Sequence, residues 1–168
     1  MNKLREDIEE ITSEIIMNSD MYNIPVDVIA IANSNDIKVY EGDLDKKISG
    51  AIRYNKEDDI FEILVNKNDV YTRQRFTIAH ELGHYFLHRD FLRCEELHVD
   101  IMYRTMSNIN IKDREREKEV DYFAGALLMN RMLLEKMYNE NNSIQELSDM
   151  FDVSVSAMTV RLDVLGLL

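Results

Sequence analysis

Residues 73–88 read RQRFTIAHELGHYFLH and contain the pattern His-Glu-x-x-His at His80, Glu81 and His84. Residues four apart on an α-helix lie one above the other, so His80 and His84 can offer two imidazole nitrogens to one metal ion. Glu81 lies at the edge of that face, where it can reach a water molecule bound to the metal and accept its proton. Apolar side chains occupy most other sides of the segment, which predicts a buried helix over residues 72–89.

A catalytic zinc ion keeps three protein ligands and one open position, so this helix needs a third ligand from elsewhere. Glu117 and Asp121 lie four residues apart in a later segment that predicts a helix, so both can face the histidines. Glu117 is the predicted third ligand; the competing choices are Glu119, which lies off that face, or a histidine, His88 or His98. Asp121 is predicted to accept the second ring N–H of His80 or of its partner histidine, which fixes the tautomer.

Several other side chains near the motif are expected to play lesser roles. His88 lies one turn further along the same face and is expected to pack or to support the ligands rather than to bind the metal. His98 is expected to be an ordinary loop histidine, with stabilisation of an oxyanion as the minor alternative. Cys94 has no clearly activating neighbour and is expected to be inert. Arg73 and Arg75 are expected to form structural or surface ion pairs near the start of the helix.

Hydrophobic periodicity predicts an α+β fold. Helices are expected over residues 2–18, 112–129, 131–138 and 143–151. A further helix is expected to begin with Pro25 in its first turn, and the last helix of the chain is expected to end at Gly166. Strands are expected at residues 37–40, 49–54 and 60–66. Their short connections predict a small antiparallel sheet of about three strands, packed on the metal-binding helix. The side chains of residues 90–111 show no clean periodicity, which predicts a loop with short helical turns.

Gly83 is costly inside a helix and is expected to mark the close approach of another backbone, such as a strand.

The expected organisation is a metal-binding domain over residues 1–142 and a helical tail over residues 143–168 that packs on it. Two helices around a turn give this tail the shape of a helix-turn-helix. Its basic residue is Arg161, against four acidic side chains, and binding to a DNA backbone needs Lys and Arg. A structural or partner-docking role is therefore expected for the tail, and direct nucleic-acid binding is not.

Composition points to a cytoplasmic protein. The chain has 168 residues with 20 Lys and Arg against 32 Asp and Glu, a formal net charge of −12, which disfavours broad binding to nucleic acid. No apolar run is long enough to cross a membrane, and the N-terminus has no apolar stretch typical of a secretory signal. The single cysteine cannot form an intrachain disulfide.

These residues resemble the signatures of the ImmA/IrrE metallopeptidases. The first signature is similar to residues 73–84 together with His88, and the second to the segment from Glu117 through Asp121 to Met129. The second departs from the family pattern at Asn130, where proline is usual, and at Val120-Asp121, where Ala-Asn is frequent; neither departure removes a ligand. The resemblance covers roughly residues 24–168.

The resemblance implies a zincin-like fold and a cytoplasmic gluzincin-like peptidase of phage or mobile-element type. It implies Zn²⁺ held by His80, His84 and Glu117, with Glu81 as general base. It also implies a protein substrate, a helix-turn-helix repressor whose cleavage derepresses the element's genes. The strand at residues 60–65 is expected to offer an edge on which the substrate lies extended. The alternative function is a zinc-containing regulator that binds and inactivates a repressor without cutting it.

Overall fold

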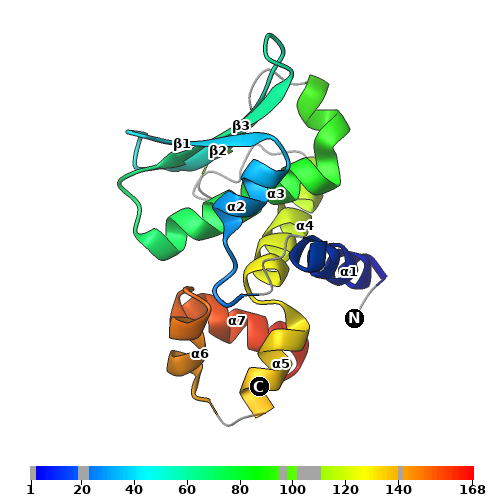
Figure 1. Ribbon diagram of the computed structural model, residues 1–168, viewed down its shortest axis with the longest axis vertical. Coiled ribbons are helices and arrows are strands. Elements are labelled where there is room, and N and C mark those ends of the chain that lie inside the picture. Colours follow the sequence, from blue (N-terminus) through cyan, green and yellow to red (C-terminus); the bar gives the residue numbers. More distant parts are fainter. Residues whose placement is uncertain (1–2, 19–22, 95–97, 102–110, 140–141) are drawn as a thin grey trace.

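The α+β fold is confirmed: a sheet lies at one end of the molecule, three short helices lie at the other, and two long helices cross between them (Figure 1). This computed structural model describes residues 3–18, 23–94, 98–101, 111–139 and 142–168. The elements in chain order are α1 (Lys3–Asn18), α2 (Val28–Ser34), β1 (Ile37–Gly42), β2 (Ile48–Asn55), β3 (Ile60–Asn66), α3 (Tyr71–Cys94), β4 (His98–Ile101), α4 (Ile111–Leu128), α5 (Arg131–Asn139), α6 (Ile144–Met150) and α7 (Val155–Leu165). Within the described residues, no helix is both long and apolar enough to cross a bilayer.

The sheet differs from the expected antiparallel arrangement. It has four strands in the order β1-β3-β2-β4; β1 runs parallel to β3, while β2 is antiparallel to both of its neighbours. The short connection between β2 and β3 does join an antiparallel pair, but the short connection after β1 does not, because β3 inserts between β1 and β2. The expectation that β3 offers a free edge to substrate is therefore wrong, because β3 has a strand partner on each side.

Two other boundaries also differ. The helix expected to open at Pro25 begins at Val28, because Asp27 is its N-cap and accepts from the backbone N–H groups of Ile29 and Ala30. Residues 90–111 are not simply a loop with short turns: α3 continues to Cys94, with a break in helical geometry at His88, and β4 follows. Residues 95–97 and 102–110 of that stretch lie outside the described residues.

Helix α3 is packed tightly between the sheet and α4, and a glycine marks each contact. A side chain at Gly50 of β2 would place its Cβ 2.4 Å from Thr77 Cγ2 of α3 and 2.9 Å from the Leu64 carbonyl oxygen. A Cβ at Gly83 of α3 would lie 3.1 Å from the Val120 side chain and 3.3 Å from its Cα. The close approach expected at Gly83 thus exists, but its partner is α4 and not a strand.

The three C-terminal helices share one continuous core with the rest of the chain. Buried apolar residues of this core come from α1, α2, the sheet and each of the helices α3 to α7. Helix α6 opens with a capping box, in which Ser143 and Glu146 exchange side-chain and backbone hydrogen bonds. Helix α7 ends at Gly166, whose φ of 71° is the left-handed conformation that glycine adopts without strain.

Candidate metal centre

Helices α3 and α4 bring His80, His84 and Glu117 together. The Nε2 atoms of the two histidines lie 3.2 Å apart. The Glu117 carboxylate lies 3.3 Å from His80 Nε2 through one oxygen and 3.5 Å from His84 Nε2 through the other. Both histidines are buried, and the Glu117 side chain is 16% exposed. The three residues therefore form a compact group of donors that could hold a metal ion.

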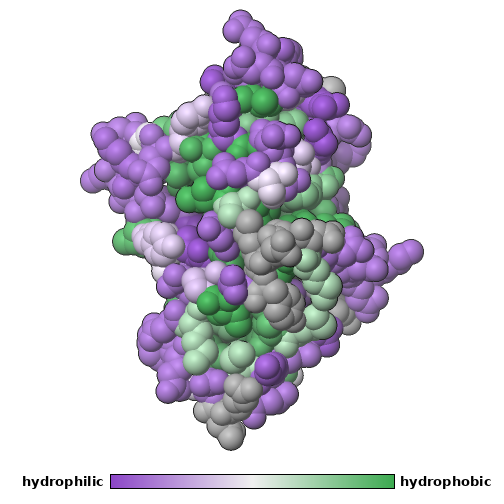
Figure 2. Space-filling model, viewed as in Figure 1, coloured by the Kyte–Doolittle hydropathy of each residue, from purple (hydrophilic) through white to green (hydrophobic). Residues whose placement is uncertain are grey.

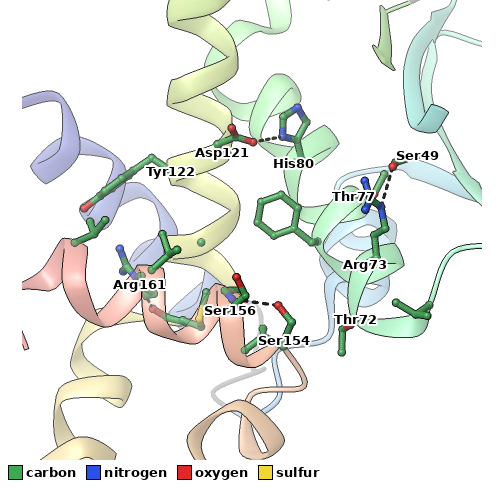
Figure 3. A pocket seen from close by; sticks show the side chains of 18 residues that line it. Ser49, Thr72, Arg73, Thr77, His80, Asp121, Tyr122, Ser154, Ser156 and Arg161 are labelled. Atoms are coloured by element: carbon green, nitrogen blue, oxygen red, sulfur yellow. Dashed lines mark hydrogen bonds and ion pairs between the residues drawn. The ribbon is translucent and has the colours of Figure 1, made fainter. Parts of the chain in front are cut away.

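Asp121 prepares His80 for such a role. Its Oδ1 lies 3.0 Å from His80 Nδ1, on the ring side opposite the donor group (Figure 3). A carboxylate accepts hydrogen bonds, so the ring proton resides on Nδ1 and Nε2 keeps a lone pair that faces His84 and Glu117. Of the two histidines that the prediction left open as partners of Asp121, the structure places His80 beside it.

The dimensions of the donor group fit a tetrahedral metal. With metal–ligand distances of about 2.0–2.2 Å, neighbouring ligand atoms of a tetrahedron lie about 3.3–3.6 Å apart. The three separations observed here, 3.2, 3.3 and 3.5 Å, are close to that range. Two neutral imidazoles and one carboxylate are also a donor set that suits zinc and leaves a fourth position for water or substrate.

Glu81 is fully buried at the interface between α3 and the sheet. Its side chain has 0% exposure, and Oε1 lies 3.6 Å from where a Cβ would stand at Gly50. The missing side chain at Gly50 therefore leaves space both for the packing of α3 on β2 and for the Glu81 carboxylate. No local sequence pattern identifies Gly50, because a glycine inside a strand gives no sign of which helix will cover it.

The two competing candidates pair with each other, away from the three donors. His88 Nε2 lies 3.4 Å from Glu119 Oε2. Burial, and then the nearby negative charge of Glu115, raise the pKa of the Glu119 carboxyl above its usual value. The His98 backbone pairs with Ile52 in the sheet, and the side chains of His98 and Cys94 lie outside the part of the chain that the structure describes.

A groove of about 650 Å³ begins at His80 and Asp121 and extends to α7 (Figure 3). Arg161, on the wall of this groove, binds Glu9 of α1 with both terminal nitrogens, at 2.7 and 2.9 Å. Tyr122 donates to the same Glu9 carboxylate at 2.7 Å, and burial followed by this hydrogen bond raises the pKa of the phenol. These three residues tie α1, α4 and α7 together, and no local sequence pattern identifies them.

Arg75 also has a larger role than an ion pair at the helix start. It is 5% exposed and donates to the carbonyl oxygens of Val26, 2.9 Å away, and Asp152, 3.2 Å away. It thereby joins the start of α3 to the segment before α2 and to the turn between α6 and α7. Arg73 instead contacts Ser49 and Asp69, at 3.1 and 3.3 Å.

Comparison with known proteins agrees with this geometry. The family model described as IrrE N-terminal-like domain, Peptidase_M78, matches residues 32–163. The chain is 27% identical over 141 residues to metallopeptidase ImmA of Bacillus subtilis (strain 168), a match that covers 83% of this chain and 76% of that protein. Its fold is similar to that of a Mycobacterium tuberculosis transcriptional regulator, with a TM-score of 0.64 and 18% identity. That match covers 94% of this chain and 46% of the regulator, so the chain spans less than half of the regulator's length.

The family is one of metallopeptidases, which implies a metal, and the family model spans both α3 and α4, with all three donors. The chain therefore belongs to the ImmA/IrrE family, as an IrrE N-terminal-like domain of the Peptidase_M78 type.

Proposed function

We propose that this protein is a zinc-dependent intracellular peptidase that cleaves a helix-turn-helix repressor of a phage or mobile element. The observation that carries the proposal is the group of His80, His84 and Glu117 donors on α3 and α4, with Asp121 behind His80. In support, membership of a metallopeptidase family implies a metal and a protein substrate. The composition of the chain supports the intracellular compartment, and the resemblance of the two signatures to the ImmA/IrrE metallopeptidases supports the repressor as substrate.

His80, His84 and Glu117 would hold the metal in this proposal. When bound, zinc makes water a stronger acid and polarises the carbonyl of the scissile bond. Asp121 keeps the Nδ1 proton on His80 and so keeps its Nε2 available as a donor. Glu81 accepts the proton of the attacking water and later delivers it to the leaving amine. Burial of Glu81 shields its carboxylate from bulk water, and proton transfer then takes place in a dry, fixed environment.

We also propose that residues 143–168 are a tail with a structural or docking role and do not bind DNA. The support for this is the position of Arg161, which is 4% exposed and bound to Glu9. The tail's single basic side chain is thereby directed into the molecule, while Asp149 and Asp163 are exposed at its surface.

Glu81→Gln tests the proposed reaction. The amide has nearly the same size as the carboxylate but cannot accept the proton, so cleavage of a co-expressed repressor encoded beside this gene should fall by about a hundredfold or more. Zinc content, measured by mass spectrometry, should stay unchanged, because Glu81 is not one of the proposed ligands. Glu119→Gln is the matched control and should cleave normally. A Glu81→Gln protein that still inactivates the repressor would support the alternative, binding without proteolysis.

A further inference from the structure

The groove borders the candidate metal centre at His80 and Asp121; Glu81, His84 and Glu117 are not among its lining residues. His80, one of the three donors, forms part of its wall at one end. From there the groove extends to Ser154, Ser156 and Arg161 beside and on α7 (Figure 3). Its lining also includes Phe76 of α3, Gly125 of α4 and Val160 of α7. A polypeptide bound at the metal centre therefore has a path along the groove, between the metal-binding helix and the C-terminal helix.

The groove offers apolar contacts rather than free charges. Its charged side chains already have partners within the protein: Arg73 with Asp69, His80 with Asp121, and Arg161 with Glu9. Between these pairs most of the wall surface is apolar, from valine, alanine, methionine and phenylalanine side chains, and uncharged hydroxyl groups come from Ser49, Thr72, Thr77, Ser154 and Ser156. An apolar wall with satisfied charges favours an apolar occupant, because an unpaired charge would lose its hydration there without gaining a partner.

Apolar side chains at the groove stay exposed to solvent. Val70, just before α3, is 70% exposed, and Val160 on α7 is 60% exposed. Polar residues cover most of the edges of the face seen in Figure 2, and the apolar patches lie inside its outline. Exposed apolar side chains that line a concavity next to a candidate reaction centre are typical of a binding surface.

The wall formed by α7 is held in a fixed position. Arg161 donates from Nε to the Met129 carbonyl oxygen at 3.1 Å, in addition to its two bonds with Glu9. Arg75 holds the turn before α7 through the Asp152 carbonyl oxygen. Since a buried side chain at each end fixes α7 against the rest of the protein, the width of the groove is preset, as specificity for side-chain size requires.

We propose that this groove is the specificity pocket of the peptidase and that it holds a large aliphatic or aromatic side chain of the substrate, next to the bond that is cleaved. The inference rests on the proposed function and adds the substrate class: segments with Leu, Met, Ile or Phe beside the scissile bond. A volume of about 650 Å³ falls within the range of about 300–1,000 Å³ that is typical of pockets for whole small ligands, so the groove has room for such a side chain together with neighbouring residues of the substrate. The helix α7 then determines specificity, although it contributes none of the three metal donors.

Val160→Asp places a charge on the groove wall, and Val155→Asp is its matched control. Both valines are exposed on α7, at 60% and 43%, but Val155 is not part of the groove. A mixture of randomised decapeptides is digested by each zinc-loaded protein, and the new termini are sequenced by mass spectrometry. The wild-type protein and Val155→Asp should cut beside large apolar residues, whereas Val160→Asp should lose about tenfold or more of this activity.

A second experiment measures peptide binding to the groove without hydrolysis. Two fluorescent decapeptides that differ only in a central Leu or Ser are bound to the Glu81→Gln protein in the presence of zinc, and their anisotropy is recorded. The Leu peptide should bind more tightly, and adding Val160→Asp should remove that preference while Val155→Asp keeps it. Circular dichroism and zinc content of all variants should match the wild type.

The outcomes separate this inference from the proposed function. Cleavage without preference for apolar residues, or an unchanged preference in Val160→Asp, would overturn the groove as a specificity pocket while the peptidase stands. Equal binding of the Leu and Ser peptides would overturn it as well. A wild-type protein that cuts no peptide, although its Glu81→Gln form binds the Leu peptide through Val160, would overturn the hydrolysis and leave the groove as an apolar peptide-binding site.

Discussion

At Gly83, α3 meets α4 with no side chain between them. The Cα of Val120 would stand 3.3 Å from a Cβ at this position, and Glu117 lies one turn before Val120 on the same helix. A side chain at residue 83 must therefore push away the helix that carries one of the three proposed ligands. The glycine thus couples the packing of two helices to the size of the donor group.

Gly83→Ala should reduce both stability and metal affinity. Overpacking costs about 1–3 kcal/mol, while replacing a helical glycine gains about 1 kcal/mol, so the net loss should be up to about 2 kcal/mol. Gly125→Ala is the matched control. A Cβ there meets nothing within 4 Å, so this variant should show only the stabilisation from replacing a helical glycine. Urea denaturation gives the two free energies, and zinc competition with a chromophoric chelator gives the affinity. Equal free energies of unfolding for the two variants would show that α4 can move away from residue 83 without loss of stability.

The site residues differ in how far the sequence predicts them. His80, Glu81 and His84 follow from the spacing in one helix, and the four-residue interval between Glu117 and Asp121 gives the third donor and its neighbour, since helix geometry is local. Glu9 could not be found in this way. Its partner Arg161 lies 152 residues further along the chain, and only the packing of α1 beside α4 and α7 brings the two together.

At the level of elements, the periods of the sequence place the helices and strands but not their neighbours. Strands β1, β2 and β3 lie where alternation and β-branched residues indicate them. The order β1-β3-β2 cannot be predicted in the same way, because the side-chain pattern of a strand indicates which face is buried and not which strand lies beside it. The kink of α3 at His88 is equally hidden, since the residues around it are helix formers on both sides.

The pair of Glu9 and Arg161 is the strongest polar connection between α1 and α7. Glu9→Ala leaves the Arg161 charge buried without its carboxylate, and removal of one partner of a buried pair costs about 3–5 kcal/mol. Thermal denaturation should show this as a large drop in Tm. Glu10→Ala, at the exposed neighbouring position, should change little. The double variant Glu9→Leu, Arg161→Met should recover much of the loss, because an apolar pair of similar volume carries no desolvation penalty. A Glu9→Ala protein as stable as Glu10→Ala would contradict the assignment of the pair as a structural tie.

At the scale of the whole molecule, the donor group bridges its two ends. His80 and His84 belong to α3, which packs on the sheet, while Glu117 belongs to α4, which leads to the C-terminal helices (Figure 1). Arg75 of α3 connects the same two ends through its hydrogen bond to the Asp152 carbonyl oxygen, and Arg161 joins α7 to the end of α4 through the Met129 carbonyl oxygen. A metal bound at this junction should therefore stabilise the fold globally and not only the residues that hold it, because it binds an arrangement that exists only when both helices are docked.

Metal removal should consequently lower Tm. At a free zinc concentration of a hundred times Kd, binding stabilises the folded protein by about 2.7 kcal/mol. Each kcal/mol corresponds to about 2–4 °C for a chain of this size, so a chelator should lower Tm by about 5–10 °C.

Glu117→Gln should lower the Tm measured in zinc and make it insensitive to chelator, because a neutral amide is a poor ligand. Glu119→Gln changes the competing carboxylate on the same helix, which lies beside His88 instead, and should keep the full chelator response. The opposite result, a lost response in Glu119→Gln and a normal one in Glu117→Gln, would move the third ligand to Glu119. Calorimetric scans of the three proteins with and without chelator therefore measure both the stabilisation by the metal and the identity of its third ligand.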